Sequence, residues 1–161
     1  MTNNDILRRI RYTFDFNDSK MIALFGLADL QVTRGEISDW LKKDDDSAFQ
    51  QCNDIQLAIF LNGLINDKRG KKEGPQPDPE KSLTNNIIFM KLKIALNLKA
   101  EDVMEIMDLA LANLRISKHE LSAFFRRPDH KHYRDCKDQI LRNFINGVQL
   151  KYRDNIQFKK N

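Results

Sequence analysis

Apolar side chains recur at helical spacing from the first residues of the chain. Ile6, Leu7, Ile10 and Phe14 would share one face of a helix, and this pattern predicts a helix over about 4–15. A second helix is expected over about 18–29, beginning at Asp18. No segment shows the two-residue alternation of a half-buried strand, so the pattern predicts an all-α protein.

The helical pattern occurs twice, because the chain is similar to itself. Residues 17–65, shifted by 84 positions, fall on 101–149, and 14 of these 49 pairs are identical. Upstream the shift is 82, which matches Thr2-Asn3-Asn4 with Thr84-Asn85-Asn86. We place the two-residue difference in a loop between these segments, where insertions are tolerated. The sequence therefore predicts two pseudo-symmetric repeats of about four helices each.

The third helix of each repeat has the clearest start. Thr33-x-x-Glu36 and Ser117-x-x-Glu120 are capping boxes, in which a hydroxyl and a carboxylate each satisfy a free backbone N–H. The fourth helix is expected over about 52–65 and 136–150, with Asp54 and Asp138 as caps or as partners of the helix dipole. Asn3 or Asn4 is the expected cap of the first helix, whose copy should cover about 86–97.

These boundaries divide the chain into repeat 1 (1–66), a linker (67–83), repeat 2 (84–150) and a basic tail (151–161). Two Gly, three Pro and a run of charges are typical of an exposed linker. One core is expected in each repeat. The first should contain Leu27, Leu30, Ile37, Trp40, Leu41, Leu57, Phe60 and Leu61, and the second Leu111, Leu114, Leu121, Phe124, Leu141, Phe144 and Ile145.

Composition narrows the class of protein. A hydrophobic fraction of 41% allows a packed core, and a charged fraction of 31% suits a soluble surface. No apolar stretch approaches the roughly 20 residues of a membrane helix, and the first residues do not resemble a secretory signal. We therefore expect a cytoplasmic protein without a membrane segment. Residues 1–65 carry seven basic and ten acidic side chains, whereas 84–150 carry eleven and eight. This asymmetry can serve an anionic partner or can help the two halves dock.

Several segments together resemble the YehS family, a bacterial group of unknown function. They are Asn4-Asp-Ile-Leu-Arg-Arg-Ile-Arg-Tyr12, Phe60-Leu-Asn-Gly-Leu-Ile65, Lys68-Arg-Gly70, Asn85-Asn-Ile87 and Pro128-Asp-His-Lys-His-Tyr-Arg-Asp-Cys136. The similarity covers about residues 1–150. It implies a duplicated helical protein and brings no activity or site residue with it.

A second resemblance is to the core of a bacterial helix-turn-helix. It is carried by 27–41 and 111–125, where an Ala in one helix, an aliphatic residue after the turn and a Thr or Ser cap recur in order. Gln31 and Arg115 stand where that motif usually has Gly. The resemblance implies that the recognition helix of repeat 2 exposes a basic face to solvent. The nucleic-acid or anion contacts implied there and in the following loop are Lys118, His119, Ser122, Arg126, Arg127, His130, Lys131, His132 and Arg134.

Other chemistry has weaker signals. His130-x-His132-x-x-x-Cys136 is the one cluster of metal-ligand types, but its spacing matches no zinc pattern and repeat 1 lacks the histidines. Cys52 and Cys136 are equivalent, and we expect two buried free thiols rather than a disulfide. No phosphate loop, nucleophile motif or dinucleotide fingerprint occurs, so neither an enzyme nor a cofactor is expected.

Three functional hypotheses remain. The first is a non-enzymatic binding or regulatory module that acts through a macromolecular partner, because two similar units can present two similar surfaces. The second is nucleic-acid binding through the helix-turn-helix-like segments, with repeat 2 the better candidate. The third is a metal-binding or enzymatic role of the loop that carries His130 and His132. The sequence identifies neither a partner nor an oligomeric state.

Overall fold

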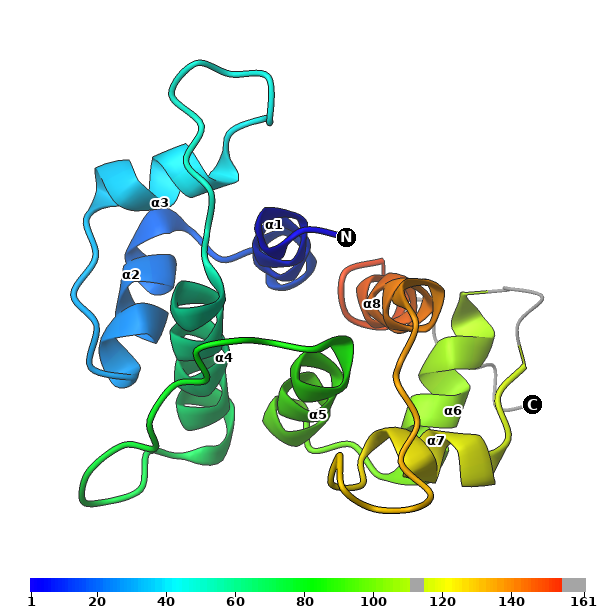
Figure 1. The fold of residues 1–161 in the computed structure, drawn as a ribbon. Coiled ribbons are helices and arrows are strands. Elements are labelled where there is room, and N and C mark those ends of the chain that lie inside the picture. Colours follow the sequence, from blue (N-terminus) through cyan, green and yellow to red (C-terminus); the bar gives the residue numbers. More distant parts are fainter. Residues whose placement is uncertain (111–114, 155–161) are drawn as a thin grey trace.

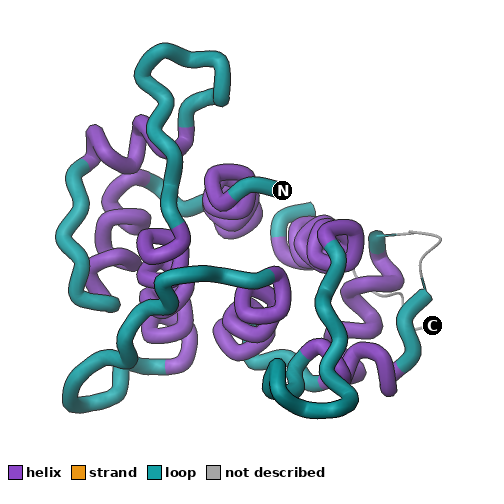
Figure 2. Tube along the Cα trace, viewed as in Figure 1, coloured by secondary structure: helices purple, strands orange, loops and turns teal. Residues whose placement is uncertain are grey.

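The computed structural model describes residues 1–110 and 115–154, and this part of the chain contains eight helices and no strand (Figures 1 and 2). Repeat 1 supplies α1 (Asn3–Phe14), α2 (Asp18–Leu27), α3 (Arg34–Leu41) and α4 (Asp54–Arg69). Repeat 2 supplies α5 (Asn85–Ala95), α6 (Ala100–Leu109), α7 (Lys118–Phe124) and α8 (Asp138–Tyr152). The all-α prediction with two repeats of four helices is confirmed. None of these helices is long and apolar enough to cross a membrane.

The two repeats meet through their first and last helices. In Figure 1, α2 and α3 lie at one end of the molecule and α6 and α7 at the other, with α1, α4, α5 and α8 between them. The first helix of each repeat packs on the last helix of the other, α1 on α8 and α5 on α4. The buried apolar side chains consequently form one continuous cluster, not the two separate cores expected from the sequence.

Most of the expected core residues are buried. Those confirmed are Ile37, Trp40, Leu57, Phe60, Leu61, Leu121, Phe124, Leu141, Phe144 and Ile145. Leu27, Leu30 and Leu41 are only partly buried, because they lie at or beyond the ends of short helices where one side faces solvent. Leu111 and Leu114 lie outside the described residues. Tilted aromatic pairs lie in each half, such as Phe25 against Phe60 and Phe89 against Phe144.

The helix starts follow the capping signals, with one correction. Thr33/Glu36 and Ser117/Glu120 form the expected capping boxes at α3 and α7. Asp54 and Asp138 lie in the first turns of α4 and α8. The cap of α1 is Thr2, whose hydroxyl accepts from the Asp5 backbone N–H, so the expectation of Asn3 or Asn4 was wrong. Both asparagines lie inside the helix, and their side chains make contacts elsewhere in the fold.

The second helices match in a different register from the predicted one. Both α1 and α5 end on a left-handed residue, Asp15 at φ 53° and Asn97 at φ 55°, and both next helices begin three residues later. The shift of 82 thus continues through the second helix and pairs buried Leu24 with Ile106. The prediction that Asp18 and Ile22 match Asp102 and Ile106 was wrong. The two extra residues lie between α6 and α7, in a connection of 110–117 against 28–33.

These connections bear on the helix-turn-helix resemblance. Six residues join α2 to α3, whereas the DNA-binding motif uses a turn of about three or four residues. In repeat 2, residues 111–114 of the corresponding segment lie outside the described residues. The left-handed residue in the first connection is Asp29, not Gln31. The resemblance is therefore not confirmed as a geometry. The last helices also run longer than predicted, to Arg69 in α4 and to Tyr152 in α8.

Gly63 and Gly147 fix the closest helix contact in each repeat. A Cβ added at Gly63 would lie 1.8 Å from the Leu24 carbonyl oxygen, and one at Gly147 would lie 2.1 Å from that of Ile106. Since these atoms are backbone, they cannot rotate away. The glycine therefore lets α4 rest directly on α2, and α8 on α6.

Candidate functional site

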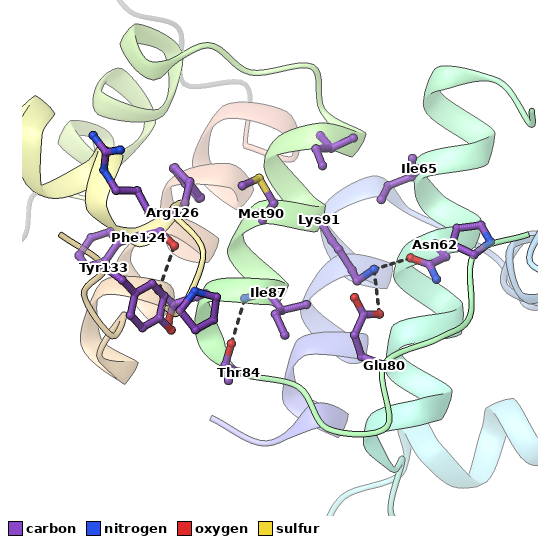
Figure 3. A pocket seen from close by; sticks show the side chains of 15 residues that line it. Asn62, Ile65, Glu80, Thr84, Ile87, Met90, Lys91, Phe124, Arg126 and Tyr133 are labelled. Carbon is purple, nitrogen blue, oxygen red and sulfur yellow. Dashed lines mark hydrogen bonds and ion pairs between the residues drawn. The ribbon is translucent and has the colours of Figure 1, made fainter. Parts of the chain in front are cut away.

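A mainly apolar groove opens on the described surface of repeat 2, and we call it the α5 groove. It has a volume of about 480 Å³. Its floor is α5, one wall comes from α4 and the linker, and the other wall comes from the end of α7 and the loop that follows (Figure 3). Its lining residues are Asn62, Ile65, Pro77, Glu80, Thr84, Asn86, Ile87, Met90, Lys91, Ile94, Phe124, Phe125, Arg126, Pro128 and Tyr133.

The floor of the groove follows from the pattern of α5. One face of this helix is buried through Ile88, Phe89, Leu92 and Ala95. Ile87, Met90 and Ile94 recur at spacings of three and four on another face, and the protein covers that face only in part. Ile94 is 44% exposed, which is unusual for so large an apolar side chain in this chain. The helix is therefore apolar on two sides, and only one of them is fully covered by the fold.

Asn86 holds in place the groove wall formed by the end of α7 and the loop that follows. Its buried side chain donates to the carbonyl oxygens of Phe124 at 3.0 Å and Arg134 at 2.8 Å, and accepts from the Cys136 N–H at 2.9 Å. Asn85 donates to the carbonyl oxygen of Cys136 and to the carboxylate of Asp138. Two neighbouring asparagines thus hold the loop between α7 and α8 against α5. Asn4 and Asn3 make the same contacts to the corresponding loop of repeat 1.

Lys91 holds in place the other wall, which is formed by α4 and the linker. Its ammonium donates to the Asn62 side-chain oxygen at 2.6 Å and lies 3.1 Å from the Glu80 carboxylate, with only 12% of the side chain exposed (Figure 3). This contact joins α4, the linker and α5 at one point. Arg9 is the counterpart in repeat 1, and it donates to Asn146 at 2.7 Å and to Gln149 at 3.0 Å. Lys91 thus joins α5 to α4 of the other repeat, and Arg9 joins α1 to α8 in the same way.

The corresponding place in repeat 1 is closed by one side chain. Asp5, Arg8 and Tyr12 stand where the floor of the α5 groove has Ile87, Met90 and Ile94. Arg8 lies 3.0 Å from the carboxylate of Asp5 and 2.8 Å from that of Asp44.

The Arg8 guanidinium also donates to the carbonyl oxygens of Leu41 and Lys42, and it lies over the Phe49 ring. A hollow of about 260 Å³ beside Arg8 is lined by Met1, Asp5, Arg8, Arg9 and Arg142.

A second hollow adjoins the α5 groove. It has a volume of about 370 Å³ and shares Phe125 and Arg126 with the groove. Lys93 and Lys118 line it together with the hydroxyl-bearing Ser122. Lys93 lies over the Phe125 ring, 5.4 Å from its centre. We call this the basic hollow, since three of its side chains are cations.

The residues predicted from sequence divide between this region and open solvent. Lys118, Ser122 and Arg126 meet at the basic hollow, and Arg126 also borders the α5 groove. His119, Arg127, His130, Lys131, His132 and Arg134 are exposed and line neither hollow. Arg127 pairs with Asp129 at 3.6 Å. The structure thus brings three of the nine predicted residues together.

The histidines lie near one another without forming a metal site. Ring centres are 6.3 Å apart for His119 and His132 and 5.5 Å apart for His130 and His132. His130 accepts from the His132 backbone N–H through Nδ1, which turns one ring nitrogen toward the loop itself. Within residues 1–110 and 115–154, no three His, Cys, Asp or Glu side chains are placed to hold a metal ion.

Cys52 and Cys136 are buried free thiols, as the sequence predicted. Burial raises the pKa of each thiol to about 12, and neighbouring Asp54 and Asp138 act in the same direction. Each thiol points at the carbonyl oxygen of the next residue. Because a thiolate is the reactive form, neither cysteine is suited to nucleophilic chemistry at neutral pH.

Sequence reasoning missed the α5 groove, although a signal for it was present. Its apolar floor differs from repeat 1 at three positions related by the shift of 82, Asp5/Ile87, Arg8/Met90 and Tyr12/Ile94. The walls lie far apart in sequence, at Ile65, Phe125 and Tyr133, and only the fold shows that they meet.

Comparison with known proteins agrees with the duplication. A family model described as protein of unknown function (DUF1456) matches residues 3–70 and 85–154. The chain is 44% identical over 149 residues to the uncharacterized protein YehS of Escherichia coli (strain K12). The aligned residues cover 92% of this chain and 94% of that protein. No solved structure matches the chain. The resemblance to the YehS family is thereby confirmed.

Proposed function

The chain belongs to the DUF1456 family of proteins of unknown function, and we propose that this member is a non-enzymatic binding module. In this proposal, repeat 2 binds an amphipathic helical segment of another cytoplasmic protein in the α5 groove. The observation that carries the proposal is the open apolar floor of Ile87, Met90 and Ile94 at a place that Arg8 closes in repeat 1.

The shape of the groove supports a helical occupant. Its floor offers apolar side chains at spacings of three and four along α5. Phe125, Pro128 and Tyr133 form an apolar wall beside them. A helix that presents apolar residues at i, i+3 or i+4 and i+7 fits such a surface, and this is a common way in which proteins bind short segments of their partners. The groove volume of about 480 Å³ lies in the range of pockets that hold a few side chains.

The charge around the groove supports an acidic occupant rather than a second copy of this chain. Arg126 stands on the rim without a carboxylate partner among the described residues, and its nearest polar contact is His130 at 3.4 Å. Lys93 lies on the same side, in the hollow that shares Phe125 and Arg126 with the groove. A twofold dimer through this groove would bring two such basic rims into one interface, because both copies use the same patch. Like charges oppose that arrangement.

A peptide-display selection against the full chain tests the proposal. A library of helical peptides with randomised surfaces is selected for binding to the native protein and counter-selected against the Met90→Arg variant. This substitution gives the groove floor the arginine that repeat 1 has at the corresponding position, Arg8. We expect enriched peptides with apolar residues at i, i+3 or i+4 and i+7. Their affinity should fall by at least about tenfold on Met90→Arg, because a charged side chain replaces an apolar contact. Arg8→Lys is the matched control in repeat 1 and should leave binding unchanged.

Three results would overturn the proposal. One is a selection that enriches no peptide able to distinguish the native chain from Met90→Arg. Another is a dimer in solution that Met90→Arg converts to a monomer, since a second copy would then occupy the groove. The third is binding of random duplex DNA at about 50 mM salt that Arg126→Glu/Arg127→Glu abolishes, which would favour nucleic-acid binding instead.

A further inference from the structure

We infer that the basic hollow is an anion site that receives a carboxylate or phosphate group of whatever occupies the α5 groove. The inference rests on the proposed function, because the group is held only where the apolar part of the same ligand lies in the groove. The two openings are joined through Phe125 and Arg126, which line both. A ligand seated on Met90 can therefore reach the hollow without leaving the surface.

The cations of the hollow come from three elements. Lys93 projects from α5, Lys118 from the start of α7, and Arg126 from just beyond the end of α7. Ser122 adds a hydroxyl between them. Lys118 pairs with Glu101 at 2.7 Å, and this contact holds the pKa of that carboxyl below its ordinary value. Glu101 thus offsets Lys118, whereas Lys93 and Arg126 have no carboxylate partner among the described residues, so the hollow keeps a net positive charge.

Repeat 1 carries three cations at the matching positions, and one of them is paired with a carboxylate. Arg11, Arg34 and Lys42 are the counterparts of Lys93, Lys118 and Arg126. Lys42 pairs with Asp39 at 2.6 Å, but the position of Asp39 is held by Ala123 in repeat 2. The first residue of the second helix is Asp18 in repeat 1 and Ala100 in repeat 2. Two carboxylates of repeat 1 have thus been replaced by alanine around the basic hollow.

The replacement matters because Ala100 itself lines the hollow. An Asp side chain there would bring a negative charge to the site that an anionic ligand must enter. Arg126, in turn, has no carboxylate one helical turn before it, since Ala123 holds that place. Charge and apolar opening change together between the repeats. Repeat 1 has Arg8 and the additional carboxylates Asp18 and Asp39 at these places, whereas repeat 2 has an apolar groove and alanines.

A pair of dyes with the same aromatic body separates the two parts of the site. 8-Anilinonaphthalene-1-sulfonate carries an anion, and N-phenyl-1-naphthylamine lacks it. Fluorescence titration should show both dyes on the native chain. Lys93→Gln/Arg126→Gln should weaken the sulfonate by about tenfold and the neutral dye by less than about twofold, because charge-assisted contacts serve only the anion.

Ala100→Asp supplies an independent variant that keeps the fold. An aspartate in the first turn of α6 is favoured by the helix dipole, so the helix should be as stable as before. We expect sulfonate affinity to fall by about fivefold with little change for the neutral dye. Lys42→Gln, at the counterpart of Arg126 in repeat 1, is the matched control and should change neither affinity.

The results distinguish this inference from the proposed function. If the neutral dye binds and Met90→Arg removes it, but the charge variants shift both dyes equally, the anion site is refuted while the groove stands. If neither dye binds the native chain, both fail. When the inference holds, selected peptides carrying Glu or phosphoserine at the end nearest Arg126 should bind more tightly than their Gln or Ser versions. The preferred one of those two groups identifies the anion.

Discussion

The same place in the two repeats is closed in one and open in the other. In repeat 1, Arg8 bonds to two carboxylates and two backbone carbonyl groups and fills the space above α1. In repeat 2, Met90 makes none of those bonds and leaves the space above α5 as an apolar groove. A buried scaffold can thus be kept in both copies while one exposed helix face acquires a different use. The scaffold that both repeats share includes Gly63 and Gly147 and the two asparagine pairs.

Gly147→Ala should give the largest effect, because it breaks the scaffold that the repeats share. The new methyl carbon would meet the Ile106 carbonyl oxygen, and α8 must move away from α6. We expect the free energy of unfolding to fall by about 3 kcal/mol. Chemical denaturation measures this loss. Gly26→Ala has nothing within 4 Å of the added carbon and should be neutral or slightly stabilising. Equal losses in both variants would contradict the close contact.

Asn86→Ala should give an intermediate loss and should separate the two repeats. It leaves two carbonyl oxygens and one buried N–H without their partner, which costs roughly 2 kcal/mol of unfolding free energy. Asn4→Ala removes the same bonds in repeat 1 and should cost a similar amount. Only Asn86→Ala should also weaken N-phenyl-1-naphthylamine binding, because only that loop walls an open groove. Weakening by Asn4→Ala as well would count against a site confined to repeat 2.

Arg8→Met should give the smallest change in stability, since its ion pairs are partly exposed. We expect a loss of about 1 kcal/mol. Removing the guanidinium should uncover an apolar surface over Phe49 in repeat 1. Calorimetric titration with N-phenyl-1-naphthylamine should then show a second, weaker site beside the first. An unchanged stoichiometry would mean that Arg8 is not what closes repeat 1.

Local signals in the sequence were sufficient for most of the fold. Helical spacing and the capping boxes at Thr33 and Ser117 depend on neighbouring residues, and both were predicted correctly. The predicted alignment of the second helices was wrong because Asp18 and Ile22 happen to be identical to the residues 84 positions later, Asp102 and Ile106. Burial, which pairs Leu24 with Ile106, is a property of packing and is not carried by residue identity.

The site was harder to predict for a related reason. Lys118, Ser122 and Arg126 were found because they belong to one short basic segment. Lys93 and Met90 were not, since the contacts that give them a role run from α5 to a loop more than thirty residues away. The most useful signal was the set of positions at which the copies differ. Shared positions describe the scaffold, and the altered exposed ones mark the surface on which we propose that repeat 2 binds its partner.

Methyl NMR of the methionines tests the central comparison most directly. The chain has five, at positions 1, 21, 90, 104 and 107, and Met1 lines the charged hollow beside Arg8 in repeat 1 whereas Met90 lines the apolar groove of repeat 2. Adding N-phenyl-1-naphthylamine to the full chain with ¹³C-labelled methionine methyl groups should shift the Met90 signal and leave that of Met1 in place. A shift of Met1 as large as that of Met90, or no shift of Met90, would contradict an open groove in repeat 2 alone.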